Sequence, residues 1–396
     1  MPASPIRKLA PLAYEAEDRG VKIYRLNIGQ PDLPTPQKAL DALKDVDRKT
    51  LEYSPSQGYK SLRKALVNYY ERYQIKLTAD EIIITAGGSE AVLFAFMSCL
   101  NPGDEIIVPE PAYANYMAFA VSAGAVIRTV TTTIEEGFCL PKVEKFEELI
   151  NERTKAILIC NPNNPTGYLY TQKEMNQIRD LVKKHNLYLF SDEVYREFIY
   201  TGSPYISSMH LEGIEQNVVL IDSVSKRYSE CGIRIGALIT KNKAVRDTVM
   251  KFCQARLSPP LIGQIVAEAS IEGTEAYSRE VYEEYLERRK CLIDGVNGIP
   301  GCYTPIPMGA FYTVAKLPVD DAEKFCEWCL SDFKWKDEYT PEGCKGETVM
   351  MAPAAGFYTT PGSGVDQVRL AYVLCKEDIQ RALFVLERAL EEYKEN

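Results

Sequence analysis

Lys226 is the residue whose setting most directly suggests covalent chemistry. It follows an apolar segment in LIDSVSKRYSECGIRIG, is preceded by Ser223 and Ser225, and lies eight positions before Arg234. A lysine amine can form a Schiff base with a carbonyl group and can then move a proton, provided that its neutral form is accessible. A lysine on a polar surface loop is the alternative, so this motif alone does not decide the chemistry.

Asp192 and Tyr195 are two groups that could act on an aromatic ring. Both lie in SDEVYREF, directly after the apolar segment NLYLF. Their spacing of about one helical turn lets both side chains point into one cleft. A carboxylate beside a heterocyclic nitrogen keeps that nitrogen protonated, and a phenol can hydrogen-bond to a ring oxygen. The alternative for Asp192 is an N-cap, a common role for aspartate at a strand-to-helix turn.

Three further segments place polar or aromatic groups after apolar runs. Asn164, in NPNNPTG, presents an amide on a turn that contains two prolines. Gly88 and Ser89, in TAGGSEA, would open a helix with free N–H groups and a hydroxyl, which suits a phosphate. Tyr113, in PEPAYANY, could stack on a flat ligand. A plain turn or core packing would explain each segment alone, but together with the lysine they fit one ligand: flat, aromatic, phosphorylated and an aldehyde.

The elements that must position these residues are short β-rich segments that alternate with amphipathic stretches of helix length. Continuous apolar strands between helices indicate a mostly parallel sheet that is buried on both faces, and such sheets bind ligands at the carboxyl ends of their strands. The predicted fold is therefore α/β. The strands are predicted at residues 81–85, 105–109, 125–130, 155–160, 186–191, 217–222 and 235–240.

The pattern changes after residue 240 and predicts a smaller α+β domain. A charged helix is predicted over 275–296, either as a link between the two domains or as a solvated helix with no special role. The polar segment 332–347 is predicted to be a loop. Other helices are predicted at 242–252, 260–271 and 377–393, with strands around 309–317, 346–353 and 367–374. The predicted division is an N-terminal arm with part of the small domain (1–45), a large domain (46–285) and a C-terminal small domain (286–396).

Composition excludes several classes of protein. The 396 residues are 46% hydrophobic and 26% charged, which is typical of a globular chain and not of a disordered one. The net charge of -9 argues against nucleic acid or an anionic membrane as a partner. The longest apolar run, Ala91–Leu100, is too short to span a bilayer, and no apolar signal-peptide core is visible near the N-terminus. We expect a cytoplasmic protein.

Cysteine and histidine usage argues against a metal centre. The 11 cysteines are scattered, and the one close pair, Cys326 and Cys329, lies in a helical pattern that even with Cys344 lacks a fourth ligand. We expect free thiols and no metal. Of the two histidines, His185 sits where a helix gives way to a strand, so the general base is expected to be another residue type.

The set of motifs, in this chain order, resembles the class I/II aminotransferases of fold type I, which use pyridoxal 5′-phosphate. The resemblance extends from NIGQPDLPTP (27–36) to QVRLAY (367–372) and is greatest to bacterial aspartate aminotransferases. It implies a large domain with a mostly parallel sheet between helices and a smaller α+β domain. It also implies that Lys226 is the Schiff-base lysine and general base. By the same resemblance, Asp192 pairs with the pyridine nitrogen of the cofactor and Tyr195 bonds to its ring oxygen.

The resemblance assigns the remaining site residues as well. It implies that the cofactor is bound by Tyr53, Gly88, Ser89, Tyr113, Asn164, Asp192, Tyr195, Ser223, Lys226 and Arg234. The residues expected to bind the substrate are Gly29, Asn164 and Arg369, with Arg369 on the α-carboxylate. Tyr53 matches a tyrosine that reaches the phosphate from a partner subunit, which implies a homodimer.

The implied reaction is amino transfer from L-aspartate to 2-oxoglutarate, both small molecules. An aromatic or alanine aminotransferase and a C–S β-lyase on the same fold are the alternatives. A purely regulatory binding module ranks last, because the catalytic groups are intact and no basic segment precedes them. Arg256, in CQARLSPPL, is a candidate for reading a second carboxylate, with a structural role as the alternative. The chain departs from the family at Ile233, where tryptophan is common, and at Cys231.

Overall fold

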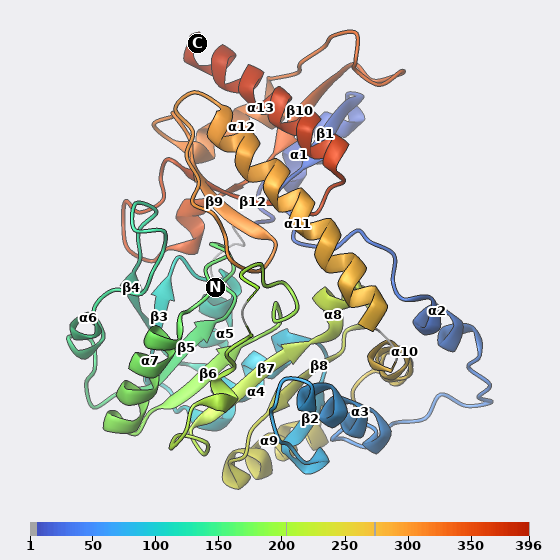
Figure 1. Cartoon of the computed structure of the whole chain (residues 1–396), viewed down its shortest axis with the longest axis vertical. Coiled ribbons are helices and arrows are strands. Elements are labelled where there is room, and N and C mark those ends of the chain that lie inside the picture. The colour runs from blue at the N-terminus through green and yellow to red at the C-terminus, as the bar shows by residue number, and fades with distance from the viewer. Residues whose placement is uncertain (1–5, 203, 273–274, 396) are drawn as a thin grey trace.

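A seven-stranded sheet forms the larger part of the molecule. The computed structural model describes residues 6–202, 204–272 and 275–395 (Figure 1). Within these residues the strand order is β2-β8-β7-β6-β5-β3-β4, and β8 alone runs antiparallel to its neighbours. These strands are β2 (Ile82–Thr85), β3 (Glu105–Glu110), β4 (Val126–Thr131), β5 (Thr154–Cys160), β6 (Tyr188–Asp192), β7 (Val218–Ser223) and β8 (Gly236–Ile239). The seven predicted strands and the α/β fold are confirmed.

Helices cover both faces of this sheet, which explains its continuous apolar strands. On β5, Ile157 and Ile159 belong to a buried cluster with the apolar side chains of α7 (Gln172–His185). Ala156 and Leu158 belong to a second cluster with those of α4 (Gly88–Cys99). Alternate residues therefore serve opposite faces. The helices of this part are α2 (Gln37–Lys44), α3 (Lys60–Glu71), α4 (Gly88–Cys99), α5 (Asn115–Ala123), α6 (Val143–Glu147), α7 (Gln172–His185), α8 (Val224–Arg227), α9 (Lys243–Arg256) and α10 (Leu261–Ile271).

A smaller α+β part is built from both ends of the chain. Strand β1 (Val21–Arg25) pairs in parallel with β10 (Gly346–Met350). Beside them, β12 (Gln367–Ala371) pairs antiparallel with β9 (Tyr312–Lys316) and β11 (Ala352–Pro353). The helices here are α1 (Ala10–Asp18), α11 (Glu275–Gly298), α12 (Ala322–Ser331) and α13 (Lys376–Glu395).

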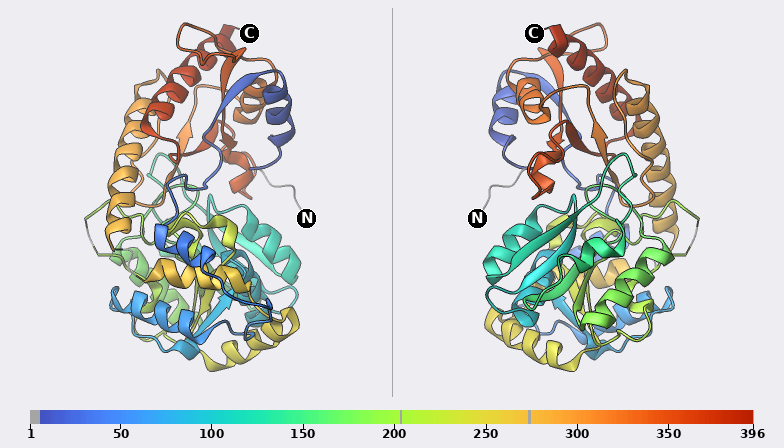
Figure 2. Two further views of the ribbon diagram at one scale, coloured as in Figure 1. Left: turned by 90° about the vertical axis from the view of Figure 1, so that its right-hand side faces the viewer. Right: turned by 90° about the vertical axis from the view of Figure 1, so that its left-hand side faces the viewer.

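The long helix α11 joins the two parts, which is the first of the two roles that the sequence left open for it. Figure 2 shows it running along one side of the molecule from the sheet to the smaller part. It passes without a break through the predicted boundary at 285/286, so the exact domain limits stay a prediction. Segment 332–347 is a loop up to Lys345, and its last two residues already belong to β10.

Other sequence expectations can be followed in the same way. Cys326 and Cys329 are free and buried on α12. His185 is the last residue of α7, where its Nε2 lies 2.8 Å from Glu147 Oε2. Among the described residues, no helix combines the length and apolar character that crossing a membrane requires.

Candidate active site

Lys226 sits on a single helical turn at the carboxyl end of β7. Ser223 caps this turn, since its Oγ accepts from the backbone N–H of Ser225 at 3.2 Å. The half-buried Lys226 donates from Nζ to the carbonyl of Gly29 at 2.9 Å and lies 3.8 Å from Cys231 Sγ. A Cβ on residue 29 would lie 1.6 Å from the hydroxyl of Tyr312, so this close approach requires glycine.

A path of hydrogen bonds connects the lysine to Arg369. The hydroxyl of Tyr312 donates to the Gly29 carbonyl at 3.4 Å and lies 3.2 Å from the hydroxyl of Tyr195. Asn164 Nδ2 donates to Tyr195 Oη at 3.2 Å, and Arg369 Nη1 donates to Asn164 Oδ1 at 3.1 Å. The structure therefore brings together predicted residues that follow β5, β6 and β7 and one that lies in β12.

Arg369 is a buried cation without an anionic partner. Its side chain stacks on Tyr312, with the guanidinium carbon 4.6 Å from the ring centre, and only 1% of the residue is exposed. It donates to the carbonyl of Asn27 and to Asn164, which are neutral acceptors, and its Nε has no partner. Burial lowers the pKa of Arg369. In the described part of the chain it forms no ion pair, so the site suits an incoming carboxylate.

Asp192 ends β6 and contacts one of a pair of adjoining tyrosines. Its carboxylate accepts from the hydroxyl of Tyr116 at 2.6 Å, and burial raises the pKa of Asp192 to about 6. The rings of Tyr113 and Tyr116 meet edge to face with centres 5.4 Å apart, and Asn115 Nδ2 donates to Tyr113 Oη at 2.7 Å. A cavity of about 550 Å³ lies beside these rings and is also lined by Phe357.

The start of α4 forms a cradle for an anion. Gly87 precedes the helix with φ +79° and provides no side-chain cap, so the first N–H groups of Gly88 and Ser89 have no side-chain partner there. A Cβ on Gly87 would lie 2.1 Å from Arg234 Nη2, and a Cβ on Gly88 would lie 3.7 Å from the Cβ of Ser223. Free N–H groups, a guanidinium and hydroxyls together favour a phosphate.

Two predicted residues lie apart from this constellation. Tyr53 is 75% exposed and makes no polar contact with the site residues among the parts of the chain that the structure describes. Arg256 Nη1 pairs with Glu90 Oε2 at 2.6 Å, and its Nη2 donates to the carbonyl of Ser56 at 3.0 Å. Arg256 is thus held by its own protein partners. No cluster of metal-binding side chains occurs within the described ranges.

Sequence reasoning missed Tyr312 and Asn27, which join the lysine to Arg369. Both belong to the smaller part of the molecule, far in sequence from the sheet. Asn27 opens the quoted segment NIGQPDLPTP, but only Gly29 was singled out there, and Tyr312 lies in a predicted strand with no motif of its own. Tyr116 was visible, since it lies three positions after Tyr113 on the same turn. Its alignment with Asp192 becomes apparent only once β3 and β6 share a sheet.

The comparisons with known proteins agree with this geometry. A family model described as aminotransferase class I and II matches residues 21–382. The aspartate aminotransferase of Pyrococcus horikoshii is 31% identical over 400 residues, covering 98% of this chain and 95% of that protein. The crystal structure of the Thermotoga maritima aspartate aminotransferase is similar, with a TM-score of 0.87, 29% identity and 98% coverage of both chains. An alanine aminotransferase from Pyrococcus furiosus matches at a TM-score of 0.87, 30% identity and 98% coverage of both chains. The chain is an aminotransferase and belongs to the class I and II family.

Proposed function

We propose that this aminotransferase uses pyridoxal 5′-phosphate to transfer the amino group of L-aspartate to 2-oxoglutarate. One observation carries the proposal: the buried guanidinium of Arg369, which lacks an anion, lies on the same hydrogen-bonded path as the amine of Lys226. Within one site, the guanidinium of Arg369 can bind a carboxylate and the amine of Lys226 can react with a carbonyl group. Chemistry on an amino acid substrate requires both.

The residues present fit the cofactor. Lys226 would hold its aldehyde, Asp192 its ring nitrogen, and Tyr195 with Asn164 its ring oxygen. Tyr113 would cover the ring, and the cradle at the start of α4, with Ser223 and Arg234, would hold the phosphate. The absence of any side-chain cap at Gly87 supports this assignment, because the helix N-terminus is left for a ligand. When bound, pyridoxal phosphate accepts electrons from the substrate Cα and so makes the Cα proton acidic.

The amine of Lys226 is the proposed general base. Neither histidine is available, because His185 pairs with Glu147 and His210 Nε2 lies 2.8 Å from the carbonyl of Tyr73. The Gly29 carbonyl holds the lysine amine near Tyr312. Arg369 would bind the substrate carboxylate at the other end of the hydrogen-bonded path and so would orient the substrate toward that amine. Lys226→Ala is expected to abolish transamination, whereas full activity in this variant would refute the assignment.

Aspartate is supported by the relatives that carry that name, and an alanine aminotransferase of equal structural similarity is the rival. The test is a panel of kcat/KM values with 2-oxoglutarate for aspartate, alanine and phenylalanine. Aspartate should exceed the others by at least about tenfold. Preference for another amino acid would refute the substrate assignment. Release of pyruvate and ammonia from a cysteine conjugate without an oxo acid would indicate a β-lyase.

A cytoplasmic homodimer with shared sites completes the proposal. The exposure of Tyr53, which does not contact its own site, supports a role in the partner subunit. Mixed dimers of Lys226→Ala and Tyr53→Ala subunits test this. If Tyr53 acts across the interface, one site of each mixed dimer regains both residues and activity returns. If activity does not return and the chain sediments as a monomer, the shared site is refuted.

A further inference from the structure

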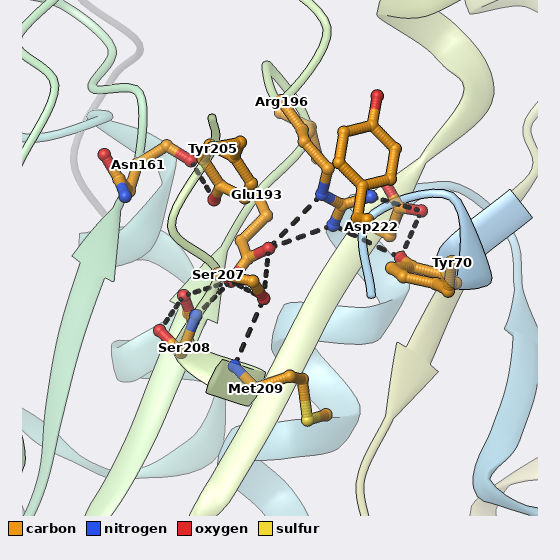
Figure 3. A network of polar contacts seen from close by, with 12 residues as sticks. Tyr70, Asn161, Glu193, Arg196, Tyr205, Ser207, Ser208, Met209 and Asp222 are labelled. Atoms are coloured by element: carbon orange, nitrogen blue, oxygen red, sulfur yellow. Dashed lines mark hydrogen bonds and ion pairs between the residues drawn. The ribbon is translucent and has the colours of Figure 1, made fainter. Parts of the chain in front are cut away.

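Four fully buried charged side chains lie behind the candidate active site, and no role described above uses them. Glu193, Arg196, Asp222 and Arg227 are each at most 2% exposed. Figure 3 shows Arg196 between the carboxylates of Glu193 and Asp222. Two acids and two guanidinium groups leave this buried cluster with no formal net charge. Charged residues are almost never buried to this extent unless they are paired, so the arrangement is specific.

The Asp222–Arg227 pair braces the turn that carries the catalytic lysine. Arg227 donates from Nη1 to Asp222 Oδ1 at 2.7 Å and from Nη2 to Oδ2 at 2.9 Å, a bidentate contact. Asp222 precedes the cap residue Ser223, and Arg227 follows Lys226 directly. Asp222 Oδ1 also accepts from the Ser223 N–H at 2.8 Å. The ion pair therefore closes α8 from end to end around Ser223 and Lys226.

The Glu193–Arg196 pair holds the neighbouring segment, which carries Asp192 and Tyr195. Arg196 Nη2 donates to Glu193 Oε2 at 3.0 Å, and Glu193 also accepts from the Ser207 hydroxyl and the Ser208 N–H at 2.9 Å each. Arg196 Nη1 lies 3.8 Å from Asp222 Oδ2. Arg196 thus connects the segment after β6 to the segment after β7.

Tyrosines of α3 cover the cluster from one side. The Tyr70 hydroxyl donates to Asp222 Oδ2 at 2.6 Å, and its ring centre lies 4.7 Å from the Arg196 guanidinium carbon. The Tyr69 ring centre lies 4.5 Å from the guanidinium carbon of Arg227. Burial alone would raise the pKa of Asp222, but the Arg227 and Arg196 guanidinium groups outweigh it and hold that pKa at about 2. The acid is therefore ionised and fixed at neutral pH.

We propose that Asp222 and Arg227 are positioning residues, which set the amine of Lys226 relative to Asp192 and Tyr195 through the cluster they form with Glu193 and Arg196. The inference rests on the proposed role of Lys226. None of the four charged residues contacts the reacting groups. Their effect comes from fixing two strand ends in one rigid arrangement, and a displacement of about 1 Å in a catalytic group can cost 10²-fold in rate.

The decisive variant is Asp222→Asn/Arg227→Met, which removes the ion pair without leaving a buried unpaired charge. We expect its melting temperature to stay within a few degrees of the parent while kcat falls about 10- to 100-fold. We also expect the pH midpoint of the cofactor absorbance change, which reports the Lys226 linkage, to move. A matched control is Glu105→Gln, at the opposite end of the same sheet, where a buried carboxylate pairs with Arg153 at 3.1 Å. That control should leave kcat and the midpoint unchanged.

Each result decides between positioning and a merely structural role. A stable double variant with parental kcat and an unmoved midpoint would overturn the proposal, as would a control that loses as much activity. Should the double variant fail to fold, Arg227→Lys keeps the charge but loses the bidentate contact, and an unchanged kcat there would overturn it. Failure of the proposed function is distinguishable, because it would appear as full activity in Lys226→Ala.

Discussion

Replacing Arg369 by lysine tests the central electrostatic argument. The substitution keeps the positive charge but replaces a planar fork, held between Asn164 and Asn27, by a single ammonium group. One charge-assisted hydrogen bond to the substrate carboxylate is lost, which costs about 1.5–3 kcal/mol. At about 1.4 kcal/mol per tenfold change, kcat/KM should fall about 10- to 100-fold. Arg369→Met, which removes the charge as well, should lose more.

The assay compares substrates that share an α-carboxylate and differ in side chain. Steady-state kcat/KM for aspartate and for alanine should fall by the same factor in Arg369→Lys, because the guanidinium would contact only the group common to both. The affinity for pyridoxal phosphate should be unchanged. A loss confined to aspartate would mean that Arg369 reads the side chain, and parental values for both substrates would refute the argument.

Three other variants address separate features. Gly87→Ala places a Cβ where Arg234 lies, at a residue with φ +79°. It is expected to weaken pyridoxal phosphate binding by at least about tenfold in a fluorescence titration. Unchanged affinity would contradict the assignment of the phosphate to the start of α4. Arg256→Met breaks the ion pair with Glu90 and should lower the melting temperature. The ratio of kcat/KM for aspartate to kcat/KM for alanine should stay the same. A large fall in that ratio would mean that Arg256 binds the second carboxylate of the substrate. Burial raises the pKa of Glu230 to about 8, so the parent should lose stability as the pH rises from about 4.5 to about 8. Glu230→Gln should flatten that part of the curve in denaturant titrations. At about 1.4 kcal/mol per pH unit between about 4.5 and about 8, the variant should be roughly 5 kcal/mol more stable than the parent at pH 9. An identical slope would show that Glu230 is already ionised.

The strand-end residues were predictable because a parallel sheet converts sequence position into spatial position. Asn164, Asp192 and Ser223 each follow or end a recognisable apolar strand, and the carboxyl ends of such strands meet at one edge. Knowing the strands was enough to place these side chains together. Arg369 was assigned only through family resemblance, since a strand arginine has no local signal.

The buried charge cluster could not be found from sequence. Arg196 and Arg227 occur in polar strings, DEVYREF and SKRYSE, that are typical of solvent-exposed segments. Their burial depends on α3, a helix that sequence analysis did not assign, whose Tyr69 and Tyr70 cover the guanidinium groups. Tyr70 on α3 contacts Asp222 and Arg196, which lie more than a hundred positions further along the chain. Contacts over such a separation leave no periodic pattern in the sequence.

The parallel pairing of β1 with β10 has a consequence for biosynthesis. Val21 is aligned with Gly346, and the Arg369 side chain donates to the carbonyl of Asn27, just after β1. During translation β1 therefore stays unpaired until nearly the whole polypeptide has left the ribosome. Synthesis of the chain as far as β10 takes roughly 20–70 s at typical elongation rates. The sheet that carries Lys226 is synthesised well before then, whereas Arg369, which would bind the substrate carboxylate, is not. A prematurely terminated chain would hold the lysine without the means to orient an amino acid, so catalytic competence arrives only with the last strand.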